Sequence, residues 1–207
     1  MKSKLTTKIL SLLMPILFLN VSALAIDLSD YKDFSSRSLI MNNQNNLINQ
    51  EQKELLKSKK LSPDAFCLIE QIKKNNIENV KILLEFKTNP NQSYMEEYPI
   101  YIAAKENNFE ILKLLYEHGA KLDKSFYSEL YEAVKHKNNE MAQFLIDKKA
   151  NIHYIDSVTQ NSILYLAIKN NMANIAQQLI EKGADINFKT LKLIKKKKLD
   201  YLLKNVN

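Results

Sequence analysis

The sequence contains Tyr98-Pro99-Ile100-Tyr101-Ile102-Ala103-Ala104 followed by Asn107-Asn108, by Ile111-Leu112-Lys113-Leu114-Leu115 and by Gly119-Ala120. A weaker copy of this block precedes it and two copies follow it, at intervals of 32, 30 and 34 residues. A repeat of this period is typical of a stack of helical units in which each unit packs only on its neighbours. The sequence therefore predicts an all-α solenoid rather than one closed core.

Each copy contains two short segments whose apolar residues recur at i, i+3 and i+4, which is the spacing of a helix. A polar break separates the segments, and asparagine stands there in three copies, at Asn75, Asn107 and Asn171. The only two glycines, Gly119 and Gly183, follow the second segment. Both residue types tolerate the left-handed conformation that ends helices. Lys87 and Lys149 take the glycine position in the other copies, so we expect less favourable turns there.

The second copy resembles the ankyrin-repeat motif T-P-L-H-x-A, with Tyr98 and Tyr101 where Thr and His usually stand. Gly119-Ala120 and Gly183-Ala184 are similar to the G-A that follows the second helix in that family. The resemblance implies an ankyrin-repeat solenoid of about four helix-pair repeats, at 62–94, 95–124, 125–158 and 159–189. Tyrosine replaces the family's His in three copies, at Tyr101, Tyr131 and Tyr165. These tyrosines have two possible roles: their hydroxyls could form hydrogen bonds with the backbone, or their rings could stack along the array.

Two further segments flank the repeats. Residues 26–61 are rich in Ser, Asn, Asp and Gln, so we expect a polar lead-in that is at most partly helical. Ser62-Pro63-Asp64 predicts the start of the first repeat, with Ser62 as the N-cap. Residues 190–207 predict two short capping helices with Lys195 to Lys198 at their junction, facing solvent.

Residues 1–25 resemble a secretory signal peptide. Lys2, Lys4 and Lys8 precede an apolar run from Ile9 to Leu19, and Ala23-Leu24-Ala25 gives a cleavage pattern. The run is too short to span a bilayer, which needs about 20 residues. An uncleaved anchor that extends through Val21 to Ile26 is the alternative. We expect a bacterial protein that is exported across the cytoplasmic membrane, is periplasmic or secreted, and has no transmembrane span after cleavage.

The composition of the 207 residues excludes several function classes. The formal net charge is +7, but Arg37 is the only arginine, which argues against sequence-specific binding of nucleic acid. Cys67 is the only cysteine and is predicted to be buried. The three histidines (His118, His136 and His153) occupy different places in the repeat and predict no metal site. No convergent set of catalytic residues is present, so we expect a protein that is not an enzyme and binds no cofactor.

The ankyrin resemblance implies that a partner binds to the concave face, which hairpin tips and first helices form. We expect a monomer that binds an unknown protein there, because exposed Tyr and Met are common interface anchors. The candidate residues are Tyr94, Met95, Glu96, Glu97, Lys105, Tyr127, His136, Asp156, Thr159, Gln160 and Lys169. The alternative for Tyr94 and Met95 is packing along the hairpin.

A lysine cluster offers an alternative function. Lys195, Lys196, Lys197 and Lys198 predict a peripheral binder of anionic membranes or another polyanion. The competing interpretation is a solvated face of the cap, because no aromatic residues interleave these lysines.

Overall fold

The computed structural model describes residues 50–203, and residues 1–49 and 204–207 lie outside the described part. The predicted signal peptide, most of the predicted lead-in and the end of the predicted cap fall outside it. The chain divides into two units, Met1–Leu55 and Leu56–Asn207. Of the first unit only residues 50–55 are described, and they are helical. All the elements that follow belong to the second unit.

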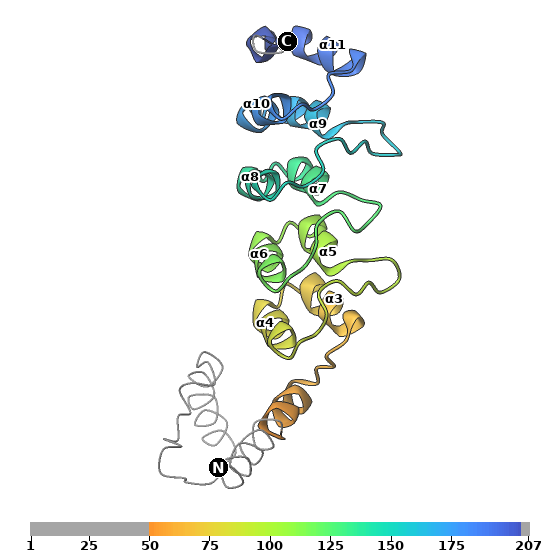
Figure 1. Ribbon diagram of the computed structural model, residues 1–207, viewed down its shortest axis with the longest axis vertical. Helices are drawn as coiled ribbons and strands as arrows, with labels where there is room; N and C mark the ends of the chain where they lie inside the picture. The colour runs from red at the N-terminus through yellow and green to blue at the C-terminus, as the bar shows by residue number, and fades with distance from the viewer. Residues whose placement is uncertain (1–49, 204–207) are drawn as a thin grey trace, which may run out of the picture. The chain divides into compact units, whose positions relative to one another are not determined.

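The second unit is a stack of helix pairs (Figure 1). The first helices of the pairs are α3 (Ala65–Lys73), α5 (Pro99–Lys105), α7 (Glu129–Lys135), α9 (Ile163–Lys169) and α11 (Phe188–Lys196). Their partners are the second helices α4 (Ile77–Glu85), α6 (Phe109–Glu117), α8 (Asn139–Asp147) and α10 (Ala173–Glu181), and the 3₁₀ helix η2 (Asp200–Leu203) after α11. Each first helix packs on its own partner and on the first helix of the next pair. The described residues form no strand.

The core lies between the helices of each pair and between neighbouring pairs. Leucines at equal places in the second helices are fully buried, at Leu83, Leu115, Leu145 and Leu179. Alanines at equal places in three first helices are also fully buried, at Ala103, Ala133 and Ala167. The first repeat has Gln71 there instead, and its side-chain oxygen accepts a hydrogen bond from Asn79 Nδ2 at 2.9 Å. Small residues let neighbouring helices approach closely, so Gln71 makes the first layer less regular.

Every helix from α3 to α11 ends with the same backbone motif. In α6 the Gly119 N–H donates to the Tyr116 carbonyl (3.0 Å) and the Ala120 N–H donates to the Leu115 carbonyl (2.9 Å). This pair of bonds needs a positive φ at the residue after the C-cap. The residues that adopt a positive φ at this position are Asn75, Lys87, Asn107, Gly119, Lys137, Lys149, Asn171, Gly183 and Lys198. The left-handed turns predicted at Asn and Gly are present, and lysine adopts the same conformation in four of these motifs.

Asparagine also begins three of the second helices. The side chains of Asn76, Asn108 and Asn138 accept hydrogen bonds from the third N–H of α4, α6 and α8. The Asn138 amide also donates to Asn107 Oδ1 of the preceding repeat (2.9 Å), and Asn108 donates to Asn75 in the same way. These Asn-Asn pairs therefore cap a helix and join two repeats.

The start of the first repeat differs from the prediction. Helix α3 begins at Ala65, and the Asp64 carboxylate accepts a hydrogen bond from the Cys67 N–H at 2.8 Å. The prediction that Ser62 is the N-cap was wrong, because Asp64 reaches the free N–H of the first turn and Pro63 stays outside the helix.

Candidate protein-binding face

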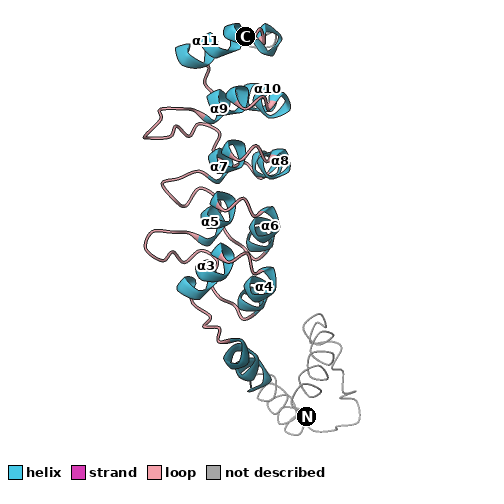
Figure 2. Cartoon of the chain, turned by 180° about the vertical axis from the view of Figure 1, so that it is seen from behind, coloured by secondary structure: helices cyan, strands magenta, loops and turns pink. Residues whose placement is uncertain are grey.

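Three hairpin loops project from the stack on the side of the first helices (Figures 1 and 2). They join α4 to α5, α6 to α7 and α8 to α9, through residues 86–98, 118–128 and 148–162. We call the surface formed by these hairpins and the first helices the hairpin face; it corresponds to the predicted concave face. Of the eleven candidate residues, Glu97 and Asp156 are half-buried and the others are exposed.

The first hairpin has a backbone that is unusual for its residues. Tyr94 and Glu97 exchange two backbone hydrogen bonds, of 3.1 and 3.0 Å. The two residues between them, Met95 and Glu96, have φ of 50° and 64°. Tight hairpin turns with two positive φ values favour Asn and Gly, which adopt this conformation at low cost. The hairpin therefore holds a strained turn that exposes the Met95 and Glu96 side chains.

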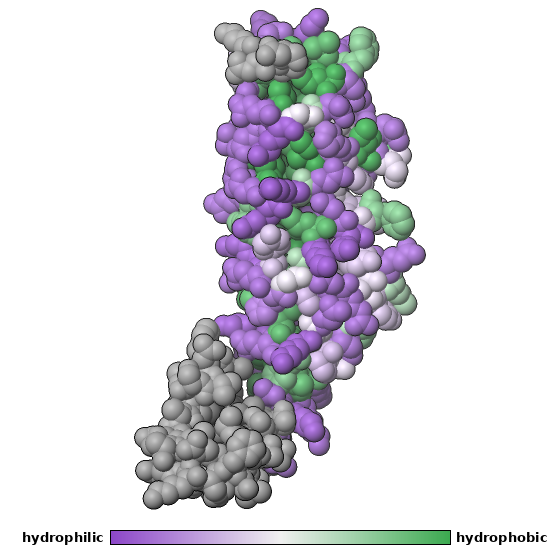
Figure 3. Space-filling model, in the orientation of Figure 1, coloured by the Kyte–Doolittle hydropathy of each residue, from purple (hydrophilic) through white to green (hydrophobic). Residues whose placement is uncertain are grey.

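Large apolar side chains stand exposed near the hairpin tips. Met95 is 79% exposed, Phe126 is 90% exposed and Val158 is 88% exposed. In Figure 3 apolar side chains appear among hydrophilic ones on the edge where the hairpins project. Sequence reasoning missed Phe126 and Val158, although an apolar residue inside a polar hairpin segment is the signal that could have found them.

Tyr94 both packs on the first helix α3 and reaches solvent. Its ring lies edge-on to Phe66 with centroids 5.0 Å apart, and the residue is 38% exposed. Glu97 at the base of the same turn forms an ion pair with Lys73 at 2.6 Å. Tyr94 therefore packs on α3 rather than along the hairpin, whereas Met95 extends into solvent.

The tyrosines that replace the family's histidine contact the next hairpin or, in the fourth copy, the next first helix. The Tyr101 ring stacks on Tyr127 at 5.2 Å. The Tyr131 ring meets Tyr154 edge-on at 5.4 Å, and its hydroxyl lies 3.4 Å from Thr159 Oγ1. In the fourth copy the Lys189 ammonium lies over the Tyr165 ring, 4.8 Å from its centroid. Ring contacts thus join α5 and α7 to the following hairpin, with a side-chain hydroxyl in one copy, and join α9 to α11.

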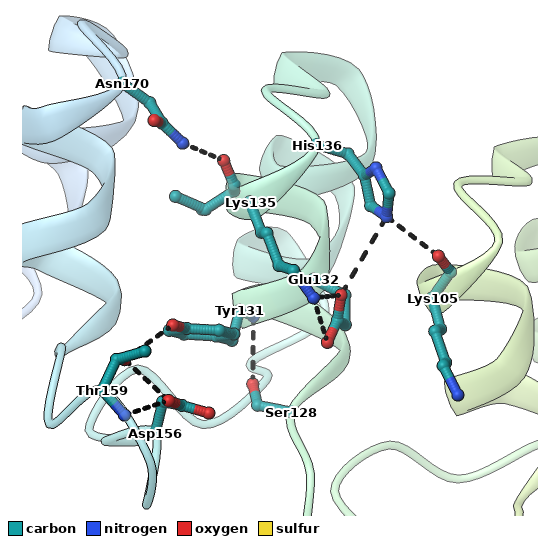
Figure 4. Close-up of polar contacts among 10 residues, drawn as sticks. Lys105, Ser128, Tyr131, Glu132, Lys135, His136, Asp156, Thr159 and Asn170 are labelled. Atoms are coloured by element: carbon teal, nitrogen blue, oxygen red, sulfur yellow. Dashed lines mark hydrogen bonds and ion pairs between the residues drawn. The ribbon is translucent and has the colours of Figure 1, made fainter.

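The Glu132 carboxylate lies on the same helix as Tyr131 (Figure 4). Only 9% of the Glu132 side chain is exposed, and its carboxylate accepts from Lys135 Nζ at 3.0 Å. His136 Nε2 lies 4.0 Å from this carboxylate and 2.8 Å from the Lys105 carbonyl of the preceding repeat. Burial, followed by the charge of Glu132, raises the pKa of Tyr101 above its ordinary value. Two candidate residues, Lys105 and His136, are thus brought together.

The contact between His136 and Lys105 belongs to a series at one repeat position. The C-cap residue of a first helix reaches back to carbonyls at the end of the preceding first helix. His136 reaches Lys105, Asn170 Nδ2 donates to the Val134 carbonyl (2.7 Å), and Lys197 Nζ donates to the Ile168 and Lys169 carbonyls (3.0 Å each). The Val134 and Ile168 carbonyls also accept the N–H groups of Lys137 and Asn171, so these side chains add a donor at a helix end, where carbonyls lack regular helical partners.

The lysine cluster is therefore not uniform. Lys195 and Lys196 are exposed in the last turn of α11, and Lys198 is exposed after it. Lys197 is half-buried and also donates to Asn171 Oδ1 at 2.5 Å. The prediction that all four lysines face solvent was wrong for Lys197, because its ammonium group donates to carbonyls at the end of α9.

The third hairpin holds the candidates Asp156, Thr159 and Gln160 in one turn. The Asp156 carboxylate accepts from the Thr159 hydroxyl (2.6 Å) and N–H (2.7 Å), and these bonds lower the pKa of Asp156. Gln160 has a positive φ of 54° and donates to the Ser157 carbonyl at 2.9 Å. These polar groups order the loop that presents Val158.

Glu129 is a buried acid that sequence reasoning did not identify. It is fully buried, its Oε2 accepts from the Asp123 N–H at 3.3 Å, and its Oε1 has no hydrogen-bond partner. Burial is the main cause that raises its pKa to about 7. It lies in the first turn of α7, where the second copy has Pro99.

Residues 50–203 contain no group of three or more His, Cys, Asp or Glu side chains placed to hold a metal ion. In the same part of the chain, no helix is both long and apolar enough to cross a bilayer.

Comparison with known proteins identifies the family. A family model described as "Ankyrin repeats (3 copies)" matches residues 39–126, 68–156 and 126–190, which together exceed half of the chain. The chain belongs to the ankyrin-repeat family. No curated protein matches its sequence. Among 286 matching chains of solved structures is the crystal structure of the human ASB11 ankyrin repeat domain. That domain is 21% identical, with a TM-score of 0.51, over 63% of this chain and 67% of its own.

The prediction of an all-α ankyrin-repeat solenoid is therefore confirmed. Ankyrin-repeat domains are generally modules for protein–protein interaction and are typically non-catalytic. The likeness to the human ASB11 domain concerns the fold alone.

Proposed function

We propose that this protein is an exported, non-catalytic ankyrin-repeat module that binds a partner protein through its hairpin face. One observation carries the proposal: successive hairpins hold the large apolar side chains of Met95, Phe126 and Val158 largely exposed. Large apolar and aromatic side chains supply most of the energy at protein interfaces. A row of them on a preformed surface can bind a partner with little loss of conformational entropy.

The strained first hairpin supports the same proposal. Positive φ at both Met95 and Glu96 costs free energy that Asn-Gly would avoid. Residues held in unfavourable backbone conformations cluster at ligand contacts and other functional sites. The turn therefore favours a role for these two side chains in binding.

Site-specific photo-crosslinking tests the use of this face. A benzophenone amino acid is placed at Tyr127 or Val158 on the hairpin face, or at Asp147 or Glu181 at the ends of α8 and α10, all exposed. In irradiated cells we expect a discrete protein adduct from the first two positions and not from the second two. Equal adducts from all four positions, or none from the hairpin face, would contradict the proposal.

Export is the second part of the proposal, and the pattern of residues 1–25 supports it. N-terminal sequencing of the protein recovered from each cell fraction tests it. We expect a chain that begins at Ile26 in the periplasmic or secreted fraction. A chain that retains Met1 in the cytoplasm would show that this segment is no export signal.

Binding of anionic membranes or another polyanion through Lys195 to Lys198 remains an alternative proposal. The exposure of Lys195, Lys196 and Lys198 favours it, whereas the bonds of Lys197 reduce the charge that the cluster offers. Replacing the three exposed lysines with alanine should then abolish binding to vesicles that contain phosphatidylserine. Unchanged vesicle binding would exclude this role for the cluster.

A further inference from the structure

All five first helices end in lysine. These residues are Lys73, Lys105, Lys135, Lys169 and Lys196. Lysine and arginine together make up 30 of the 207 residues, so their presence at all five equivalent positions exceeds what composition alone predicts. A cation near a helix C-terminus interacts favourably with the helix dipole, which explains part of this preference. The second helices have no basic residue in the last turn and instead have lysines after it in three cases, at Lys87, Lys148 and Lys182, so the first helices differ in placing the lysine within the last turn.

The five lysines differ in whether a carboxylate of this chain already pairs with them. Lys73 pairs with Glu97 at 2.6 Å, and Lys135 pairs with Glu132 at 3.0 Å. Lys105, Lys169 and Lys196 are exposed and have no carboxylate within 4.0 Å among the described residues. Figure 4 shows Lys105 and Lys135 on neighbouring first helices, with the Lys135 side chain directed to Glu132. Three positive charges along one row are therefore free to meet a partner.

The spacing of this row defines what could bind to it. Neighbouring packed helices lie about 8–10 Å apart, so successive lysines repeat at roughly that distance. A polyproline II segment has three residues per turn and a rise of about 3.1 Å, so every third side chain points the same way about 9 Å further on. An extended segment laid along the stack would bring one residue in three to each lysine position.

We infer that the partner presents an extended acidic segment, with a carboxylate at about every third residue, to the lysine row. This inference rests on the proposed function and names the chemistry of the partner at the same face. Lys105 in α5 and Lys169 in α9 are separated by one first helix, α7, whose lysine is already paired. Lys196 ends α11, which is the next first helix after α9. The free lysines thus favour carboxylates separated by about six and about three residues.

Fluorescence anisotropy with two labelled peptides tests the inference on the full chain. One peptide has glutamate at every third position, with Ser and Pro between; the other has the same composition with its glutamates clustered at one end. We expect the spaced peptide to bind at least about tenfold more tightly at low salt, because it alone reaches several lysines at once. Equal affinity, or no binding of either peptide, would overturn the inference.

Matched charge reversals show whether the row itself is responsible. The row variant is Lys105→Glu, Lys169→Glu and Lys196→Glu; the control variant is Lys87→Glu, Lys149→Glu and Lys182→Glu, at the ends of α4, α8 and α10. Both change the net charge equally and place acids at helix C-termini. We expect the row variant to lose about tenfold in affinity for the spaced peptide and the control variant less than twofold. Equal losses would indicate diffuse attraction and overturn the inference.

Two further results separate this inference from the proposed function. If position 127 crosslinks to a partner protein but neither peptide binds, the hairpin face binds a protein, and the inference that this protein presents an acidic segment is wrong. Tight binding of phosphatidylserine vesicles by the wild-type chain and its loss in the row variant would assign the lysines to a membrane and also overturn the inference.

Discussion

Glu129 places a carboxylate in the core of the third repeat. It is fully buried, and one of its two oxygens lacks a hydrogen-bond partner. Burial, with a smaller effect of the Asp123 charge, raises its pKa from 4.5 to about 7. Between these two values the folded chain binds more protons than the unfolded chain, so this group lowers stability as pH rises. The cost reaches about 3 kcal/mol above pH 7, where the carboxylate is ionised in both states.

Replacing Glu129 with glutamine should remove this pH dependence. We expect Glu129→Gln to raise the free energy of unfolding by about 2 kcal/mol at pH 8, because no buried charge remains. At pH 4.5 the two chains should be equally stable, since the glutamate is then neutral when folded. Urea denaturation of both chains at a series of pH values measures the difference. A difference that does not grow between pH 5 and pH 7 would show that Glu129 ionises normally.

Lys197 illustrates how a charged residue can be structural. Its ammonium group donates to the Ile168 and Lys169 carbonyls and to Asn171. We expect Lys197→Ala to lower the free energy of unfolding by about 1 kcal/mol, because it removes the side-chain donor to the Lys169 carbonyl and one of the donors to the Ile168 carbonyl. Lys195→Ala is the control and should change stability by less than about 0.5 kcal/mol. Equal effects of the two substitutions, measured by urea denaturation, would mean that the bonds of Lys197 add nothing.

At the scale of elements, the helix ends explain how a chain with two glycines forms so many tight turns. Lys149 follows the C-cap of α8 with a φ of 61°, where α6 and α10 have glycine. The left-handed conformation costs a residue with a Cβ about 1–2 kcal/mol, which a substitution by glycine would remove. The greater flexibility of glycine in the unfolded chain offsets part of this stabilisation.

We therefore expect Lys149→Gly to stabilise the chain by about 0.5–1 kcal/mol. The neighbouring Lys148 has a φ of −84°, so Lys148→Gly should destabilise by a similar amount. Thermal unfolding followed by circular dichroism compares the two variants with the wild-type chain. The backbone explanation fails if both substitutions shift the melting temperature in the same direction.

The first hairpin offers a corresponding test of strain and function. We expect Met95→Asn with Glu96→Gly to stabilise the chain by about 1–2 kcal/mol, because both residues adopt positive φ readily. Met95→Ala with Glu96→Ala is the control, since it removes the same side chains but keeps the strain. Denaturant unfolding measures the stability of both variants. If the Asn-Gly variant is no more stable than the wild-type chain, the hairpin is not strained. If either variant still crosslinks to the partner as strongly as the wild-type chain, Met95 is not used for binding.

At the scale of the whole molecule, the repeats are not equally regular. The first repeat has Gln71 in an alanine position and Lys87 in a glycine position, and the third has Glu129, Lys137 and Lys149. Glu106 is the C-cap of α5, at the position of His136 and Asn170 in the next two repeats. A carboxylate only accepts hydrogen bonds, so Glu106 cannot donate to carbonyls of the preceding first helix as His136 and Asn170 do. In a solenoid such local defects stay local, because each repeat contacts only its neighbours.

We expect amide hydrogen exchange to be fastest in the helices of the first and third repeats and slowest in the second and fourth. Exchange followed by mass spectrometry at pH 7.5 measures this difference. Glu129→Gln is the matched variant and should slow exchange in α7 and α8 more than in α3 and α4. Uniform protection across the four repeats would show that the stack unfolds as one unit.

The sequence alone determined the features that depend on neighbours along the chain. Apolar spacing of i, i+3 and i+4 predicted helix pairs, the recurrence of the block predicted a stack, and Asn107 and Gly119 marked turns that the structure has. Exposure at Met95 and Tyr127 could also be predicted, because both residues lie in a polar segment between two helices. These features depend on local steric preferences, which sequence patterns report directly.

Only the tertiary structure decided what happens between repeats. The aromatic partner of Tyr101, the burial of Glu129, the carbonyls that Lys197 caps and the row of three unpaired lysines are not visible in any local pattern. The bonds of Lys197 join residues 26 to 29 positions apart. Such pairs meet only because stacking brings equal positions of successive repeats together, so a side chain's role here depends on its neighbour one repeat away.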